Sequence, residues 1–475
     1  MKKIALIAGW IFVGATAGLG QDTGRKWTLK QCVDTALANN LPVKQYGLLT
    51  EEAKVNVSQA RSNLLPNLNG SFGYGFSQGR SVDPITNNYI NQHLSSSSVG
   101  LNSNLILFNG FRLQNLVRQN EDNYQAAKME EQQIKDNLTL NVILTYLQVL
   151  SAEDAMAIQE ENLAVLKKQV ERMEILVKEG AVGTYQLTDL QGQQADEELS
   201  LLNRRNDWQQ NKLSLSQLMN IAFDPAMQLD RGEEGAEIMA RYAASASDVY
   251  QQALSNLSVV KANEWKEKGA QRGITIARAG FFPTLSFNAN MGSSYSSLAT
   301  RLNPSTVTVV PTGDYVVSGA TENPVLRRQQ NYDAQKIGYA RQLDNNLGTF
   351  AGINLSIPLF NNFLNRNRVK TAKLNRTYVS LEAENVRLQL RKDIDAAWLN
   401  MASSFEKYKV LMAQEKSYAE SFRAAEVRFN TGVINAFEYL QAKRNLDQAR
   451  VNRSLMKYDY LFRTRLLDFY TGKTL

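Results

Sequence analysis

The sequence predicts an α+β membrane protein built from two internal repeats, each with a β-hairpin and a very long helical hairpin. Three observations lead to this fold class. A sequence pattern occurs twice along the 475 residues, residues 111–179 and 361–431 contain neither glycine nor proline, and apolar and polar residues alternate in short segments before each of these runs. The expected order within each copy is therefore helix, β-hairpin and helical hairpin.

Residues 1–20 have the features of a secretory signal peptide. Lys2 and Lys3 precede an apolar stretch from Ile4 to Val13, and small residues follow it. This stretch is too short to cross a bilayer whose hydrocarbon core is about 30 Å thick, but it suits the apolar core of a signal peptide. We therefore expect that residues 1–20 are removed and that the rest of the chain acts outside the cytoplasm.

The composition excludes several classes of function. The chain contains one cysteine, Cys32, and one histidine, His93, which rules out most zinc sites, Cys–His pairs and Ser–His triads. Cys32 lies in a helical pattern and is interpreted as a small buried residue. No run of more than two Lys or Arg residues occurs after residue 20, so no nucleic-acid partner is expected. We also expect no catalytic residues, no cofactor and no metal site.

The internal repeat is visible as two constant shifts. Ten of the 33 positions from Ala36 to Leu68 carry an identical residue 217 positions later, and Leu107-Phe108-Asn109 returns 252 positions later as Leu359-Phe360-Asn361. The increase from 217 to 252 indicates an insertion of 35 residues in the second copy. Its polar composition predicts a surface loop.

Each copy begins with a helical pattern, in residues 28–65 and 248–282. In the first copy, apolar residues that mark one face of a helix recur at every fourth position: Leu29, Val33, Leu37 and Leu41. Pro66 and Pro283 follow these patterns and are expected to end the helices.

The β-hairpins are expected in residues 67–108 and 284–360. In the first strand Leu68, Gly70, Phe72, Tyr74 and Phe76 share one face, and Asn, Ser and Gly alternate with them. Strands of about 10 residues suit a tilted crossing of a barrel wall in a membrane, although a half-buried soluble sheet has the same alternation. Four strands cannot close a barrel, and an open sheet edge in lipid leaves backbone groups unpaired. Several chains would then share one barrel, with its apolar face toward lipid, and three chains would supply twelve strands.

The two runs without glycine or proline would each form a helix about 100 Å long, at about 1.5 Å per residue. Average helices in compact domains are far shorter. Apolar residues near the end of the first run have heptad spacing, which indicates coiled-coil packing: Leu166, Val170, Met173 and Val177. The chain is expected to return in shorter helices, at 184–222 and 436–470.

These elements divide the chain into a signal peptide, two repeats and a linker that joins the repeats about midway along the helices. The expected bounds are 1–20 for the signal peptide, 21–222 for the first repeat with its helical hairpin at 109–222, 223–247 for the equatorial linker, and 248–475 for the second repeat with its helical hairpin at 361–471.

Several short motifs follow one another along the chain and are partly duplicated: Ala-Leu-x-Asn-Asn at 36–40, Leu-Pro-x-Leu at 65–68, the strand ends at 107–110 and 358–361, and the glycine turns at 180–184 and 431–434. In this order they resemble the TolC family of outer-membrane efflux proteins. The resemblance covers essentially the whole chain after residue 20. It implies a homotrimer in the outer membrane of a Gram-negative bacterium, with a twelve-stranded β-barrel continued by an α-helical coiled-coil tunnel through the periplasm.

The resemblance also implies an export channel for small molecules or polypeptides. Such a channel docks to a periplasmic adaptor protein and, through it, to an inner-membrane pump. In the resembling channels the adaptor contacts small residues at the tips of the helical hairpins, which match Gly180, Val182, Gly183, Thr184, Gly432 and Val433. Glycine lets a partner backbone approach closely, but these glycines also have the simpler role of reversing the chain.

The resembling channels carry a ring of acidic residues just above the tips, which implies a periplasmic gate at Asp189 and Glu438. Beyond Gly180 a shift of 249 relates these two residues and predicts three extra residues in the first copy. One turn further, where some members carry a second acid, this chain has Gln441. A solvated helix face or an interhelical ion pair is the alternative role for both acids.

Two other classes of protein compete with the channel. A soluble periplasmic coiled-coil adaptor or scaffold would share the signal peptide and the long helices, but it would not need a β-hairpin at the same place in both repeats. A carboxylate-dependent hydrolase would need acidic residues that converge in a pocket, and paired helices of this length offer few concave surfaces.

Overall fold

A computed structural model of the chain describes residues 26–82, 87–91, 93–232 and 241–473. The expected signal peptide at 1–20 lies outside the described residues, and so does part of the expected linker, at 233–240. The described residues form two units. The first contains residues 26–48, 129–261 and 386–473, and the second lies within 49–128 and 262–385. Each unit therefore takes segments from both repeats.

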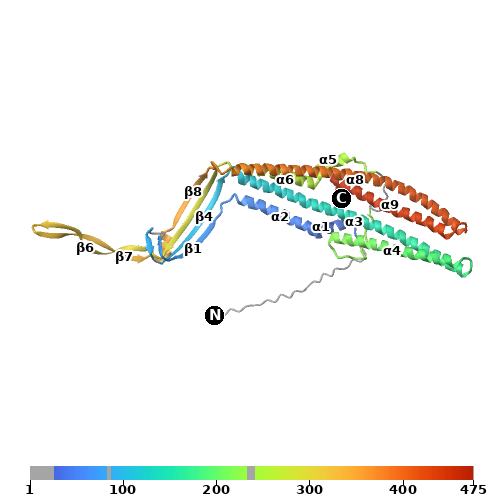
Figure 1. Cartoon of the computed structure of the whole chain (residues 1–475), viewed down its shortest axis with the longest axis horizontal. Helices are drawn as coiled ribbons and strands as arrows, with labels where there is room; N and C mark the ends of the chain where they lie inside the picture. The colour runs from blue at the N-terminus through green and yellow to red at the C-terminus, as the bar shows by residue number, and fades with distance from the viewer. Residues whose placement is uncertain (1–25, 83–86, 92, 233–240, 474–475) are drawn as a thin grey trace, which may run out of the picture. The chain divides into compact units, whose positions relative to one another are not determined.

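Two helices of 67 residues, α3 (Arg112–Lys178) and α8 (Leu364–Asn430), are the longest elements of the chain (Figure 1). They run without a break because neither contains glycine or proline, the residues least compatible with a helix interior. After a short turn, each is followed by a helix of 36 residues: α4 (Thr184–Met219) and α9 (Ala436–Thr471). The expected long helical hairpins are confirmed.

The two helical hairpins have equal lengths, and each boundary of the second lies 252 positions after the corresponding boundary of the first. The three-residue difference predicted after Gly180 is therefore wrong. The constant shift relates Asp189 to Gln441 and Gln186 to Glu438. The prediction failed because a match between two isolated acidic residues is a weaker guide than the equal distance from turn to helix in both copies.

Each lead-in helix is broken once, whereas the sequence predicted continuous helices at 28–65 and 248–282. The first copy contains α1 (Leu29–Asn39) and α2 (Leu41–Ser62), and the second contains α5 (Ala246–Asn256) and α6 (Ser258–Ala279). The breaks at Asn40 and Leu257 lie 217 positions apart, and both residues are extended. Oδ1 of Asn40 accepts a hydrogen bond from the backbone N of Val43 at 3.3 Å, so this residue also caps the start of α2.

Four antiparallel strands form the main sheet of the second unit, in the order β1-β4-β5-β8. They are β1 (Asn69–Ser77), β4 (Leu94–Phe108), β5 (Thr284–Ser296) and β8 (Gly348–Ser356). Pairing of β4 with β5 joins the hairpins of the two repeats, which sequence reasoning did not predict. Within the described sheet, β1 and β8 each keep one edge without a partner strand. The short strands β2 (Arg80–Val82) and β3 (Tyr89–Asn91) extend the first hairpin.

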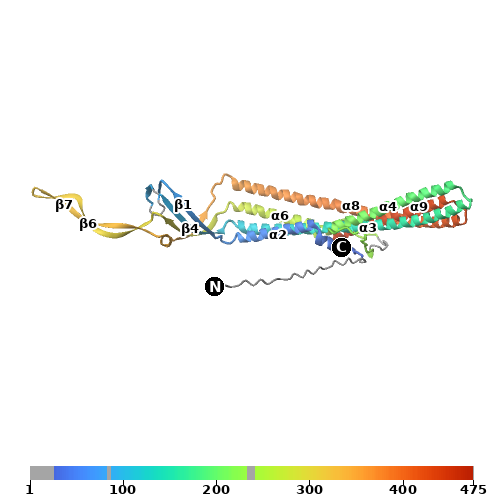
Figure 2. The same cartoon turned by 90° about the horizontal axis from the view of Figure 1, so that it is seen from below.

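The insertion of the second copy is a long β-ribbon, not the predicted surface loop. It consists of β6 (Thr300–Ser318) and β7 (Thr321–Lys336), which pair along their length (Figure 2). The loop between them has two residues and begins with Gly319 at a φ of 72°, which suits a tight hairpin. The short helix α7 (Tyr339–Asn345) returns the chain to β8. The prediction failed because polar composition concealed the alternation in β6, where β-branched residues favour a strand.

The strand-to-helix corners are duplicated as well. Phe111 and Phe363, which lie 252 positions apart, both have a positive φ, of 61° and 60°. Gly110 precedes the first of them, and a Cβ atom on this glycine would lie 2.8 Å from the Cβ of Phe282. Only glycine therefore fits at this corner of the first copy.

Two hydrophobic clusters, each built mainly from one repeat, form much of the core of the first unit. Leu138 of α3 and Leu215 of α4 lie in one cluster, and their counterparts by the shift of 252, Leu390 and Leu467, lie in the other. The duplication thus extends from the sequence to the packing. It also shows that the shift stays at 252 through both return helices.

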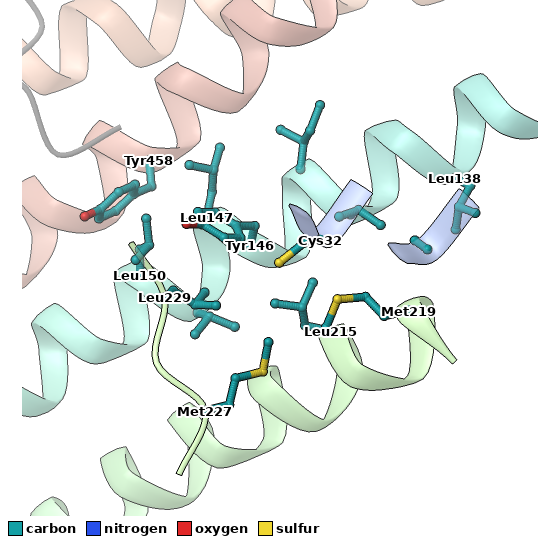
Figure 3. Close-up of a cluster of buried hydrophobic side chains, with 14 of the residues drawn as sticks. Cys32, Leu138, Tyr146, Leu147, Leu150, Leu215, Met219, Met227, Leu229 and Tyr458 are labelled. Atoms are coloured by element: carbon teal, nitrogen blue, oxygen red, sulfur yellow. The ribbon is translucent and has the colours of Figure 1, made fainter. Parts of the chain in front are cut away.

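Cys32 is fully buried in the first of these clusters, next to the side chains of α3 and α4 (Figure 3). Its counterpart in the second cluster, by the shift of 217, is Val249. Burial raises the pKa of the Cys32 thiol to about 12, so it stays protonated. The interpretation of Cys32 as a small buried residue is confirmed.

Candidate functional site

Both helical hairpins reverse direction through the same backbone motif. At the first turn Gly180 has a φ of 72°, its N–H donates to the carbonyl of Val177 at 3.0 Å, and Ala181 N–H donates to the carbonyl of Leu176 at 2.9 Å. The second turn repeats both bonds, at 3.0 and 2.8 Å, around Gly432 at a φ of 75°. These paired bonds define a Schellman motif, whose left-handed residue is normally glycine. Chain reversal therefore explains Gly180 and Gly432.

The other tip residues singled out by the sequence lie around these turns. Gly183 caps α4 with a φ of −77° and makes no side-chain capping bond, and Thr184 is the exposed first residue of the helix. Val182 is half-buried. At the second tip Val433 is 64% exposed. Each tip thus presents small side chains on an open surface, and the φ of Gly183 is one that any residue can adopt.

An apolar cluster joins the two helical hairpins next to the turns. Tyr439 of α9 is buried, and its ring centroid lies 4.7 Å from that of Phe429 and 5.4 Å from that of Phe422, both on α8. Leu166 and Val170 of α3 belong to the same cluster. The coiled-coil contact that the heptad spacing predicted at these two positions is confirmed.

Asp189 and Glu438 are both exposed, at different positions on their helices. Asp189 is the sixth residue of α4 and accepts a hydrogen bond from Nε2 of Gln193 at 2.9 Å. Glu438 is the third residue of α9, and its backbone N–H donates to Oδ1 of Asn435 at 3.0 Å. The two positions therefore differ by three residues, which correspond to about 4.5 Å along a helix axis. In the described part of the chain neither carboxylate forms an ion pair, so the structure offers no interhelical pair at these positions.

Sequence reasoning missed an ionic cluster around the buried Lys443 of α9. Its Nζ lies 2.6 Å from Oδ1 of Asp447, one turn along the helix, and 3.2 Å from Oε1 of Glu161 on α3. Burial raises the pKa of Asp447 in spite of the neighbouring ammonium group. Burial also opposes ionisation of Glu161, but hydrogen bonds from Lys443 and Arg450 lower its pKa overall. The one sequence signal was the four-residue spacing of Lys443 and Asp447, which is also common on exposed helix faces.

The two faces of the main sheet differ in polarity, and none of its four strands contains a charged residue. Directly paired residues of antiparallel strands point to the same face. One face carries Phe287 beside Leu105 and Ile353. The opposite face carries asparagines, and Nδ2 of Asn104 donates to Oδ1 of Asn288 at 2.6 Å. The register gives a wall with one uncharged apolar face and one uncharged polar face.

Two residues refine the sequence-based assignment of these faces. The register pairs Gly73 with Ser98 and so places it on the polar face, whereas Gly70 pairs with Leu101 on the apolar face. Phe350 is the one aromatic residue of β1, β4, β5 and β8 on the polar face, where it pairs with Asn290. It is 62% exposed, and its ring covers Gly352, since a Cβ there would lie 2.8 Å from the ring.

Comparison with known proteins identifies the family. The model of the outer membrane efflux protein family matches residues 32–220 and 249–473. The chain belongs to this family. Both matched segments begin within a lead-in helix and end at the close of a return helix, so they coincide with the two repeats.

Two curated relatives and one solved structure agree with this assignment. The outer membrane protein TolC of Escherichia coli is 22% identical over 97% of this chain and 84% of its own length. The probable outer membrane lipoprotein SilC of Salmonella typhimurium is 24% identical over 59% of either chain. The crystal structure of the outer membrane protein VceC of Vibrio cholerae covers 94% of this chain and 96% of its own, at 14% identity and a TM-score of 0.72.

Membership in the efflux protein family settles the function at the level of the class. The protein is an outer-membrane efflux channel of tripartite export systems, with a periplasmic helical domain. TolC-family proteins form trimers, and their β-barrel is complete only in the trimer. The competing scaffold and enzyme interpretations are set aside, because the family is one of non-enzymatic transport proteins. None of the described helices is both long and apolar enough to span a bilayer.

Proposed function

We propose that three copies of this chain form one export channel by joining their four-stranded sheets through the edges of β1 and β8. Each sheet then contributes four of twelve strands. The face that contains Phe287 and Ile353 contacts the lipid of the outer membrane, and the face that contains Asn104 and Asn288 lines a water-filled lumen. The observation that carries this proposal is the uncharged wall with two unpaired edges, because open edges in lipid cost several kcal/mol for each unpaired group.

The native mass of the protein, extracted in mild detergent from purified outer membranes, tests this assembly. We expect a species of three chains, each 53.3 kDa less the residues removed on export. A monomer in the detergent extract, or recovery of the protein in the soluble periplasmic fraction, would contradict the shared barrel.

We further infer that both helix-hairpin tips dock to a periplasmic adaptor protein, which connects the channel to an inner-membrane pump. The docking residues are Gly180, Val182, Gly183, Thr184, Gly432 and Val433. The support for this role is the pair of identical Schellman turns with small exposed side chains around them. Small residues let the backbone of a partner approach the turn closely.

For the gate, we propose that Asp189 and Glu438 form two acidic levels of the tunnel near its tip. Because they lie at the sixth and third positions of equivalent helices, a trimer would present two separate rings of three carboxylates, about 4.5 Å apart along the helix axis. A single ring of six would require equivalent positions. Carboxylates at two levels repel one another less than six carboxylates at a single level would.

The lumen-facing Phe350 gives a direct test of which sheet face lines the channel. Replacement by alanine removes a large exposed ring from the polar face, so we expect a higher single-channel conductance in planar bilayers. Ile353→Ala truncates a side chain on the opposite face of the same strand and is expected to leave the conductance unchanged. The reverse pattern would show that the faces are assigned the wrong way round.

A further inference from the structure

The β6–β7 ribbon has one apolar face and one polar face. The register pairs Leu302 with Ala334, Val309 with Arg328 and Pro311 with Leu326, and alternate residues of the two strands continue this face. Its large apolar residues are Leu302, Val307, Val309, Tyr315, Val317, Leu326 and Tyr332, and every one of them is more than half exposed.

The opposite face of the ribbon carries mostly polar side chains, several of which bond to one another, together with Val310 and Val316. Nδ2 of Asn331 donates to the hydroxyls of Thr306 and Thr308, at 3.2 and 3.1 Å, and Nδ2 of Asn303 donates to Oε1 of Gln335 at 3.0 Å. A face of this kind is compatible with water. The apolar face of the same ribbon, in contrast, resembles one side of a protein interior.

The base of the ribbon is fixed to the end of β5. Gln342 of α7 is buried, and its side chain accepts from the backbone N of Ser296 at 3.0 Å and donates to the carbonyls of Ser296 and Ile337, at 3.0 and 2.7 Å. The ring centroids of Tyr295 and Tyr339 lie 4.8 Å apart beside this contact. The ribbon therefore leaves the sheet from a rigid base.

The position of the ribbon in the chain places it outside the cell. It connects the end of β5 to the start of β8, and these strand ends are opposite the ends that continue into α6 and α8. Since the helical domain is periplasmic, the ribbon lies on the extracellular side. A two-stranded ribbon on its own is marginally stable in water, so its exposed apolar face needs a cover.

A second copy of this chain is the occupant that fits this face. The ribbon is next to β8, an edge strand through which neighbouring copies meet in the trimer, so three ribbons start from one ring at high effective concentration. The apolar face also carries Glu322 and Arg328. A neighbouring ribbon can pair these opposite charges, whereas the acyl chains of a lipid cannot.

We propose that the ribbons of the three copies pack against one another through their apolar faces beyond the extracellular mouth of the barrel. This packing rests on the trimer proposed above. In this arrangement the insertion has a role in assembly, because the packed ribbons hold the ends of β5 and β8 of neighbouring copies together.

A matched pair of cysteine variants tests the packing. Val309 and Val316 are the same residue type on the same strand and are both 58% exposed, but Val309 lies on the apolar face and Val316, paired with Asn323, lies on the polar face. The native Cys32 is buried, so it should not react with maleimides and should give no background labelling or cross-linking. In whole cells, a short bismaleimide is expected to link Val309→Cys chains to one another, whereas Val316→Cys reacts with a membrane-impermeant maleimide without forming links between chains.

Three results would overturn the proposal. Complete labelling of Val309→Cys without cross-linking would mean that the apolar face is open to water. Protection of Val309→Cys without cross-linking would mean that another molecule covers the face. Equal cross-linking of both variants would mean that the ribbons contact one another through either face and do not pack in one defined way. Leu326→Cys, on the same face, repeats the test if Val309→Cys fails to assemble.

The native mass of each variant separates the ribbon packing from the trimer itself. Trimers of normal mass without the expected cross-links would contradict the packing alone. Monomers of the unmodified chain would contradict the shared barrel and the packing together.

Discussion

Replacement of Gly183 by tryptophan is expected to abolish export almost completely and to leave the channel assembled. The residue has a φ of −77°, which any side chain can adopt, and it makes no side-chain capping bond that the substitution would remove. A Cβ at this position would lie 3.1 Å from the ring of Tyr185, an exposed side chain that can move aside. The indole would then occupy the space through which an adaptor backbone approaches the turn.

Two control variants separate loss of docking from loss of folding. Gln191→Trp places the same bulk on an exposed part of α4, on the side of the helix opposite Asp189, and it should keep export. Gly432→Ala adds little bulk but forces a side chain into a left-handed conformation, which costs about 1–2 kcal/mol, so it should lower stability more than export. Two quantities are measured for each variant. The first is the survival of a channel-deficient strain that carries the variant, in the presence of a toxic compound that the unmodified channel exports. The second is the native mass of the channel. Full resistance with Gly183→Trp would remove the docking role.

The long helices and the duplication could be read from the sequence because both depend on local features. A run such as residues 112–178 without glycine or proline leaves no place for a helix to end. The tip glycines were equally visible, since a Schellman turn requires a positive φ. The break at Asn40 was missed because the four-residue apolar spacing of Val33 and Leu37 continues across it to Leu41.

The features that the sequence did not predict depend on contacts between distant segments. Pairing of β4 with β5 brings together strands from different repeats, and no local pattern records it. Lys443 is buried beside Glu161 of α3 and Phe422 of α8, which are distant in the sequence, so its spacing to Asp447 looked like that of an exposed pair. The docking and gate roles of the tip residues stay predictions for the same reason, because the partner that would contact them is another molecule.

In the Lys443 cluster a buried ion pair within α9, between Lys443 and Asp447, is linked to α3 through Glu161. The side chains of Lys443 and Asp447 are 2% and 9% exposed. Taking both charges out of water costs several kcal/mol for each ion, which their attraction repays only in good geometry. The raised pKa of Asp447 indicates that burial outweighs the attraction of Lys443 at this carboxyl. The buried pair within α9 therefore adds little stability of its own, and the link to α3 is the contact of Lys443 with Glu161.

Asp447→Ala is expected to destabilise the helical domain by about 3 kcal/mol, the lower end for breaking a buried pair, because Glu161 still lies 3.2 Å from Lys443. The double variant Lys443→Met, Asp447→Leu removes both charges and should be close to the unmodified protein in stability, or above it. Urea unfolding of the solubilised channel, followed by its helical circular dichroism, measures both changes. If the double variant loses as much stability as Asp447→Ala, the charges themselves hold α9 against α3. If the double variant is as stable as the unmodified protein, the destabilisation by Asp447→Ala comes from the buried ammonium group that is left with one partner. Packing alone would then be enough to hold α9 against α3.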